Sequence, residues 1–167
     1  MNTISFAYEY PVTLVPDEES GGYVVSFADF PEAITQGDTV EEAIKQAEDC
    51  LEEAVANRIA MNLPLPKASH RAAGQALVSV PAPTAVKAAF YSAIRQLDVS
   101  NVQLAAMLGV DEKEVRRLLD PHHPSKLNRI DELLRRLGKR LVIGSQAITA
   151  IRVERHHRDL GRKRKAG

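Results

Sequence analysis

The sequence has little cysteine and no long apolar run. Its 167 residues include a single cysteine, Cys50, which excludes an intramolecular disulfide and a zinc site built from cysteines. A lone cysteine is typical of a reducing compartment. No apolar stretch approaches the roughly 18–20 residues that span a bilayer, and the first ten residues lack the basic start and continuous apolar stretch of a signal peptide. We therefore expect a cytoplasmic protein without membrane contact.

The chain also lacks net charge, but only as an average over two unequal parts. Hydrophobic residues make up 44% and charged residues 26%, as in soluble globular proteins, and the length fits one average domain or two small ones. Residues 1–66 carry 13 acidic and 2 basic side chains, net −11, whereas residues 67–167 carry 9 acidic and 20 basic ones, net +11. The asymmetry predicts a basic partner for the first part and a phosphate-rich polymer for the second; alternatively, each charge only solubilises its own part.

The first 80 residues predict a small α+β domain of order β-β-β-α-β. Apolar and polar residues alternate in segments 6–15 and 23–27, which favours a hairpin, and a short third strand is expected over 33–36. Thr39 and Glu42 fit a capping box for a following helix, with Asp38 as the alternative cap. That helix has one apolar stripe and an acidic outer face. A last strand is expected over 76–80.

The periodicity beyond Pro81-Ala-Pro83 is helical, and we expect this proline pair to form a stiff linker over 81–83. The predicted helices cover residues 84–97, 101–108, 112–119 and 126–137, with Ser100, Asp111 and Ser125 as N-caps for the last three. Residues 140–143 favour a short strand. The predicted organisation is a domain over 1–80, the linker, an all-α domain over 84–143 and a basic tail over 144–167.

Residues 101–120 have the spacing of a helix-turn-helix. Leu104 and Leu108 share one face of the first helix, Gly109 lies at the turn, where a positive φ is favourable, and Val115 faces inward on the second helix. The stretch resembles the helix-turn-helix of the Xre/Cro-like repressors, in which the second helix enters the major groove. The alternative is a helical bundle without DNA affinity. Candidate DNA-binding residues are Asn101, Gln103, Glu112, Lys113, Arg116, Arg117 and Lys126.

Several runs of the sequence stand out: the segments 10–14 and 22–43, Leu65-Pro-Lys-Ala-Ser69, Val115-Arg-Arg-Leu-Leu-Asp120 and Leu137-Gly-Lys-Arg-Leu-Val142. Together they resemble the HicB antitoxin family. The resemblance implies a truncated RNase H-like fold for the first part and a toxin–antitoxin pair, in which this chain covers the active site of a small, basic, RNA-cleaving toxin of the HicA type. It also implies that the helix-turn-helix represses the operon, in a bacterial cytoplasm and at the nucleoid when bound to DNA.

Two contact surfaces follow from this hypothesis. A toxin-binding surface is expected around an aromatic and a proline bounded by polar groups, and its candidate residues are Tyr23, Asp29, Phe30, Pro31, Thr35, Gln36 and Gly37. For Phe30 and Tyr23 an ordinary core position is the alternative. A homodimer, or a higher even oligomer, is expected to present two recognition helices to a palindromic operator. The candidate dimerisation residues are Ile130, Leu133, Leu134, Leu137, Leu141 and Val142.

Two other functions stay open. One is a stand-alone transcription regulator whose first domain senses another molecule. The other is a metal-dependent nuclease, because RNase H-like chemistry needs several carboxylates around two metal ions. The available carboxylates are dispersed, with Glu9 in a strand and Asp29 and Asp38 in loops, so we expect no enzyme. The sequence contains no phosphate-loop or dinucleotide fingerprint, and we expect neither a cofactor nor a metal.

Overall fold

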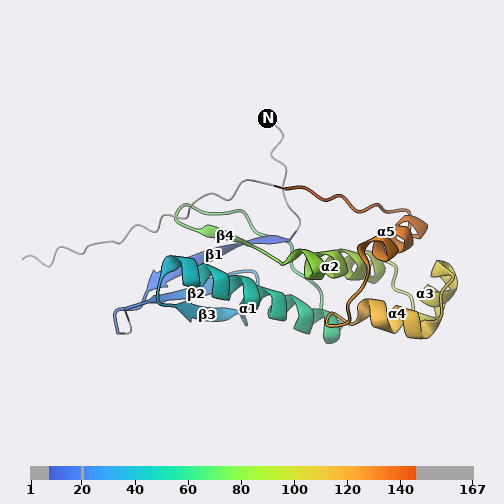
Figure 1. Ribbon diagram of the computed structural model, residues 1–167, viewed down its shortest axis with the longest axis horizontal. Coiled ribbons are helices and arrows are strands. Elements are labelled where there is room, and N and C mark those ends of the chain that lie inside the picture. Colours follow the sequence, from blue (N-terminus) through green and yellow to red (C-terminus); the bar gives the residue numbers. More distant parts are fainter. Residues whose placement is uncertain (1–7, 20, 146–167) are drawn as a thin grey trace, which may run out of the picture.

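The computed structural model describes residues 8–19 and 21–145, and they form the predicted α+β fold (Figure 1). Four strands form one antiparallel sheet of order β3-β2-β1-β4, and five helices accompany it. The strands are β1 (Glu9–Pro16), β2 (Tyr23–Phe27), β3 (Ile34–Gly37) and β4 (Ala76–Ser79). The helices are α1 (Val40–Ala60), α2 (Ala82–Arg95), α3 (Asn101–Leu108), α4 (Glu112–Leu119) and α5 (Leu127–Arg136). The predicted order β-β-β-α-β is confirmed.

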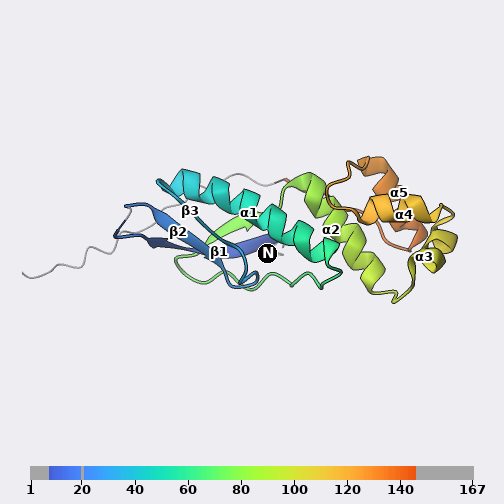
Figure 2. The same cartoon turned by 90° about the horizontal axis from the view of Figure 1, so that it is seen from below.

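The sheet buries one face against α1, as the turned view also shows (Figure 2). Alternate residues of β1 and β2 point to this buried face, namely Tyr10, Val12, Leu14, Tyr23, Val25 and Phe27, because strand side chains alternate in direction. Pro11 lies one residue beyond the β1–β2 register and pairs only with Leu77 of β4. Its missing N–H therefore leaves no bond to β2 unmade.

Helix α1 begins where its capping residues predict. The Thr39 hydroxyl accepts a hydrogen bond from the Glu42 amide at 3.1 Å, and the Glu42 carboxylate accepts one from the Asp38 amide at 3.1 Å. Thr39, not Asp38, is thus the N-cap. The apolar stripe, including Ala47 and Leu51, is fully buried against the sheet, which leaves the acidic side chains on the outer face.

The buried hydrophobic residues form two clusters that share α2. Ala88 and Tyr91 belong to the cluster between the sheet and α1, whereas Phe90 and Ile94 belong to the cluster among α3, α4 and α5. We call the sheet with α1 the sheet half, and α3–α5 the helical half. Since α2 begins at Ala82 and contains Pro83 in its first turn, the expected extended linker over 81–83 is wrong: a proline is tolerated where the helix needs no N–H donor.

Helix α5 packs inside the protomer, which corrects the expected dimer contact. Ile130, Leu133 and Leu134 are 1%, 0% and 3% exposed and belong to the helical cluster. They form the only apolar stripe of α5, and this stripe packs against α2 and α3. Leu137 and Leu141 are half-buried at the edge of the same cluster. These five residues therefore complete the protomer's own core.

Two local predictions at the ends of α5 are also wrong. The N-cap is Lys126, without a side-chain capping bond, and not Ser125. Residues 140–143 run in an extended segment that is not part of the described sheet. Residues 1–7 and 146–167 lie outside the described part of the chain, and with them most of the predicted basic tail.

Candidate functional site

The two aromatic candidates for toxin binding are buried. Phe30 is 0% exposed, packs edge-to-face on Tyr10 with ring centroids 4.9 Å apart, and lies under the Arg58 guanidinium at 4.9 Å. Tyr23 is 6% exposed and faces α1. Their side chains anchor the core of the sheet half, so neither offers a surface to a partner. The alternative interpretation of both, an ordinary core position, is the one that the structure supports.

Three further candidates serve the fold itself. The Asp29 carboxylate accepts hydrogen bonds from the Ser69 amide and hydroxyl, both at 3.0 Å, and so fixes the segment that leads to β4. Gly37 lies against the start of α1, where an added Cβ would be 2.4 Å from the Ala43 nitrogen. Thr35 is half-buried and lies opposite Val25 on the face toward α1.

Of the two exposed candidates, Gln36 belongs to a surface that the sequence did not reveal, whereas Pro31 lies in the segment before β3. The strand register aligns side chains in two rows on the sheet face opposite α1. We call these residues the open-face patch: Thr13, Val15, Val24, Ser26, Ile34 and Gln36. Val15 is 53% and Ile34 63% exposed, which is unusual for large aliphatic side chains in strands with one buried face. Only the pairing register assigns Ile34 to this face, and a four-residue strand is too short to define it by alternation.

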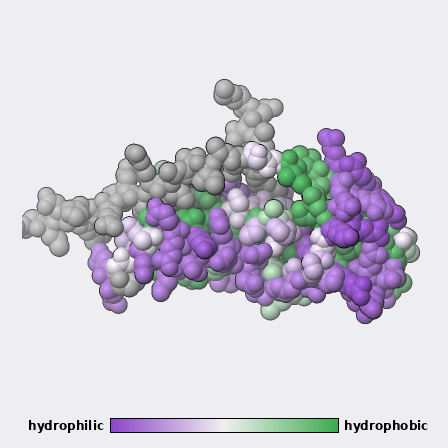
Figure 3. All heavy atoms as spheres, viewed as in Figure 1, coloured by the Kyte–Doolittle hydropathy of each residue, from purple (hydrophilic) through white to green (hydrophobic). Residues whose placement is uncertain are grey.

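The charges around the sheet half are largely unneutralised. Glu32 pairs with Arg58 at 2.6 Å, and this hydrogen-bonded guanidinium lowers the pKa of the Glu32 carboxyl. Within the described residues, no acidic side chain of α1 forms an ion pair with a lysine or arginine. The outer face of α1 exposes Glu41, Glu48, Asp49 and Glu53, and Figure 3 shows hydrophilic residues along this side of the molecule. The sheet half therefore presents an open negative charge.

In the helical half, α3 and α4 meet at the predicted three-residue turn. Ser100 and Gln103 form a capping box at α3, Gly109 ends it with φ +62°, and Asp111 caps α4 by accepting from the Glu114 amide at 2.6 Å. An added Cβ on Gly109 would also lie 2.9 Å from the Arg136 guanidinium. The predicted inward residues of both helices are buried, among them Leu104, Leu108 and Val115.

The outer face of α4 carries the exposed basic side chains that the spacing predicted. Lys113 and Arg117 have no acidic partner among the described residues, whereas Arg116 pairs with Glu112 at 2.5 Å. Asn101 is exposed at the start of α3, and Lys126 is exposed just before α5. The Gln103 carbonyl accepts from the Ser100 amide at 2.9 Å, so its side chain is engaged in the α3 cap.

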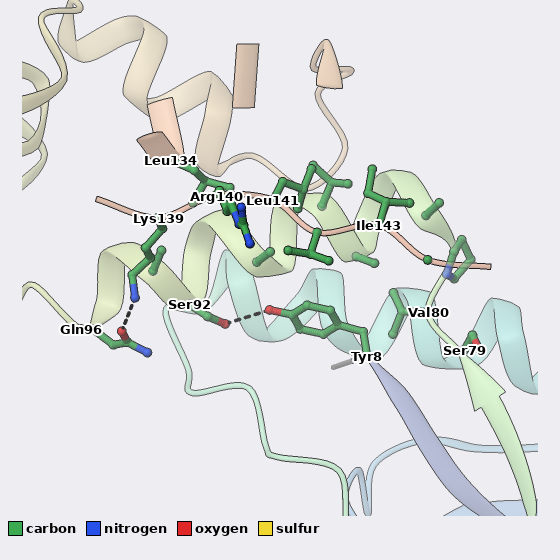
Figure 4. Close-up of a pocket in the computed structure, with 18 of the residues that line it drawn as sticks. Tyr8, Ser79, Val80, Ser92, Gln96, Leu134, Lys139, Arg140, Leu141 and Ile143 are labelled. Atoms are coloured by element: carbon green, nitrogen blue, oxygen red, sulfur yellow. Dashed lines mark hydrogen bonds between the residues drawn. The ribbon is translucent and has the colours of Figure 1, made fainter. Parts of the chain in front are cut away.

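An apolar groove of about 740 Å³ runs between α2 and the extended segment 139–144 (Figure 4). Small residues of α2, such as Ala85 and Ala89, line one side. Val142 and Ile143 line the other and are 78% and 67% exposed. Figure 3 shows an apolar patch where this segment crosses the surface. Tyr8, whose hydroxyl donates to Ser92 at 3.4 Å, forms part of the wall, and burial raises its pKa.

The carboxylates that a nuclease would need are not gathered. Glu9 accepts a hydrogen bond from Ser79 at 3.3 Å on the sheet, and Asp29 binds Ser69. Within the described residues, no three histidine, cysteine, aspartate or glutamate side chains lie together as metal ligands. In the same part of the chain, no helix combines the length and apolar character needed to cross a bilayer.

Comparisons with known proteins identify the family. The family described as HicB_like antitoxin of bacterial toxin–antitoxin systems matches residues 9–89. Antitoxin HicB of Escherichia coli (strain K12) is 38% identical over 132 residues, which are 79% of this chain and 95% of that protein. Antitoxin HicB 1 of Photorhabdus laumondii is 40% identical over 136 residues, 80% of this chain and 84% of the relative. Antitoxin HicB of Pseudomonas fluorescens is 32% identical over 144 residues, 86% and 97% of the two chains. The chain belongs to the HicB antitoxin family.

Proposed function

We propose that this chain is a cytoplasmic antitoxin that binds a small, basic, RNA-cleaving toxin of the HicA type and blocks it without chemistry of its own. Family membership supports an antitoxin role. The observation that carries the proposal is that the sheet half combines an exposed apolar surface with the exposed acidic face of α1. A basic protein approaches such a surface rapidly, since opposite charge speeds association and disfavours wrong partners.

We infer that the toxin contacts the open-face patch and not the buried aromatics. Ile34 and Val15 expose apolar area on the same sheet face as Gln36, and interface cores are built from such apolar contacts surrounded by polar groups. Glu18 and Glu19 are exposed in the turn between β1 and β2, where they add negative charge at one edge. The patch thus offers both an apolar centre and an acidic rim.

The test uses the full-length tagged chain to capture its partner from a lysate of its own host. The partner is released with denaturant, refolded and assayed for RNA cleavage. We expect cleavage that stops when an equimolar amount of the chain is returned. Replacing Ile34 with lysine should weaken this inhibition at least about 30-fold, the effect of losing a central contact worth about 2 kcal/mol.

The matched control is Met61→Lys, which adds the same charge at a 70%-exposed apolar residue at the end of α1. It should inhibit like the parent chain. Equal inhibition by Ile34→Lys and the parent would exclude the open-face patch as the toxin surface. A captured partner that does not cleave RNA, or whose cleavage continues in the presence of the chain, would contradict the antitoxin role itself.

We further propose that the α3–α4 pair is a helix-turn-helix that represses the chain's own operon. The capped helices, the left-handed Gly109 and the exposed Lys113, Arg116 and Arg117 support this role, because a recognition helix places such side chains in the major groove. Arg116→Ala should weaken binding to the promoter fragment upstream of the gene by about 1–3 kcal/mol if it contacts a base. A uniform loss on all sequences would instead assign it to phosphate.

The Glu112→Ala variant sharpens this measurement. It removes the carboxylate that pairs with Arg116 and leaves every basic side chain of α4 in place. We expect equal or tighter binding to DNA, because the negative Glu112 carboxylate no longer repels the DNA phosphates. Absence of any affinity for the promoter fragment in the parent chain would favour the alternative of a helical bundle without DNA affinity.

For the homodimer we propose the groove of Figure 4 as the contact, in place of α5. Val142 and Ile143 keep most of their surface exposed, unlike Leu133 and Leu134, and exposed aliphatic side chains beside an apolar groove favour self-association. Val142→Asp combined with Ile143→Asp should convert the dimer into a monomer in sedimentation experiments. An unchanged oligomer would exclude this segment as the contact.

A further inference from the structure

Two polar side chains are buried one turn apart on α2. Within the described residues, Thr84 and Lys87 are the polar or charged side chains with the lowest exposure, each 6% exposed. A buried lysine is rare, because removing an ammonium group from water is costly unless hydrogen bonds replace the lost hydration. The contacts of these two side chains therefore indicate why α2 carries them.

The two side chains bond to different halves of the molecule. The Thr84 hydroxyl donates to the Glu52 carboxylate of α1 at 2.5 Å. The Lys87 ammonium donates to the backbone carbonyl of Arg117 at 3.4 Å and to that of Asp120, both at the end of α4. A single turn of α2 thus joins α1 on one side and α4 on the other.

The contact of Lys87 with α4 uses groups that need a partner. The last carbonyls of a helix have no intrahelical donor, and the partial negative charge of the helix end favours a cation there. Burial lowers the pKa of Lys87, and the nearby Asp120 carboxylate opposes this effect. Loss of Lys87 would leave the end of α4 without its donor from α2.

Other hydrogen bonds fix α2 on the end of α1, but they do not bond to the end of α4 as Lys87 does. Asn62, which follows α1 with φ +55°, accepts hydrogen bonds from Tyr91 at 3.2 Å and from Arg95. Leu119 of α4 packs against both hydrophobic clusters. Helix α2 is therefore held on the sheet half at both of its ends, and Lys87 provides the polar bond from this fixed helix to α4.

We propose that Lys87 is a positioning residue, which holds α4 in one orientation relative to α1 and the sheet. Any effect of Lys87 on DNA binding rests on the proposed function of α4 as a recognition helix. A recognition helix with a fixed orientation loses less rotational freedom on binding, and its preference for the correct sequence is correspondingly larger. Lys87 itself contacts neither the proposed toxin nor DNA. It acts only by fixing the position of α4.

The orientation is measured directly, without DNA. Spin labels are attached at Glu53→Cys on α1 and Lys113→Cys on α4, both exposed, in a Cys50→Ser chain diluted with unlabelled protein so that only distances within one protomer contribute. We expect one narrow distance distribution in the parent. Lys87→Met should broaden it by at least twofold in width, while Lys87→Arg, which keeps a cationic donor, should preserve it.

The matched control is Thr84→Val, a buried polar residue of the same helix whose bond points to α1 instead. Because Tyr91 and Arg95 still hold α2 on α1, its distribution should stay narrow. The proposal is overturned if Lys87→Met is as narrow as the parent, or if Thr84→Val broadens equally. Should Lys87→Met fail to fold by circular dichroism, Lys87→Gln replaces it and is judged by the same criteria.

A DNA arm separates this proposal from the proposed function. Binding to the upstream promoter fragment is compared with binding to a scrambled fragment of equal length and at equal salt. In Lys87→Met the ratio of the two affinities should fall about tenfold, with the scrambled fragment unaffected. If the distance broadens and the parent binds neither fragment, DNA reading fails and the positioning role stands. If the distance stays narrow, the positioning role fails whatever the DNA result.

Discussion

The sheet half and the helical half differ in what their charges contact. Residues 1–66 contain 13 acidic side chains. Glu32 pairs with Arg58, whereas those on α1 form no ion pair with a described base. In the helical half, Glu112, Glu114, Asp131 and Glu132 all pair with arginines. Net charge therefore describes the sheet half well, because its charge faces outward. The net charge of +11 over residues 67–167 does not describe the helical half, because residues 101–136 carry seven basic and six acidic side chains.

This comparison narrows where a polyanion can bind. Arg129, Arg135 and Arg136 are paired on α5. Among the described residues from α3 to α5, Lys113 and Arg117 on α4 and Lys126 before α5 are exposed cations that form no ion pair. Unpaired cations release counterions when they meet phosphate, whereas paired ones must first lose their carboxylate. The surface of α4 is thus favoured over the outer face of α5.

The largest effect on the free energy of unfolding is expected from a substitution in the core of the helical half. Leu133→Ala removes a fully buried side chain of α5 and should lower the free energy of unfolding by about 2–5 kcal/mol, measured by urea denaturation. Val142→Ala, at a 78%-exposed residue, should change it by less than about 0.5 kcal/mol at a concentration where the chain is monomeric. Equal effects would contradict the position of Leu133 in the protomer's core.

The next largest effect is expected from a substitution that destabilises the sheet half without changing a charged side chain. Gly37→Ala places a Cβ 2.4 Å from the Ala43 nitrogen, so β3 or the start of α1 must shift. We expect a loss of about 1–3 kcal/mol in the free energy of unfolding, as for other overpacked positions. Gln36→Ala is the neighbouring control on the exposed face, and a comparable loss there would show that β3 is generally intolerant.

A smaller effect tests the ion pairs that distinguish the two halves. Arg129 bridges Glu114 and Glu132, each at 2.7 Å, with its side chain one-third exposed. Arg129→Gln should cost about 1 kcal/mol, since exposed pairs contribute little individually, and the loss should shrink in high salt because salt screens such pairs. Arg140→Gln, an exposed arginine without a described ion pair, should cost less; an equal cost would mean that bridging is unimportant.

The smallest effect is a difference in acid sensitivity. Hydrogen bonding to Arg135 lowers the pKa of Asp131, and hydrogen bonding to Arg129 lowers the pKa of Glu132. A lowered folded-state pKa stabilises above the unfolded value and loses this contribution as pH falls through the folded value. Below about pH 4, the ordinary range of these carboxyls, amide signals of α5 should broaden before those of β1 and β2 in NMR spectra. The reverse order would contradict the comparison.

Local patterns predicted the elements but not the surfaces. The caps at Thr39, Ser100 and Asp111 and the left-handed Gly109 are set by residues within one turn, so the sequence suffices to place them. The apolar stripe of α5 was also predicted, yet whether Leu133 packs in the protomer or against a second copy depends on distant residues of α2 and α3. In the same way, Ile34 is assigned to the open face only by its pairing with Ser26.

The sharing of α2 has a consequence for how this protein can be recombined. The family match ends at residue 89, in the middle of that helix, and residues on both sides of this point contribute to both hydrophobic clusters. A chimera that exchanges the helical half between relatives has no neutral junction after β4. The parent protein that provides α2 must also provide the residues that contact this helix, namely Glu52 and Asn62 in the sheet half or Leu119 in the helical half. Exchange of the helical half therefore requires coordinated changes on both sides of one helix.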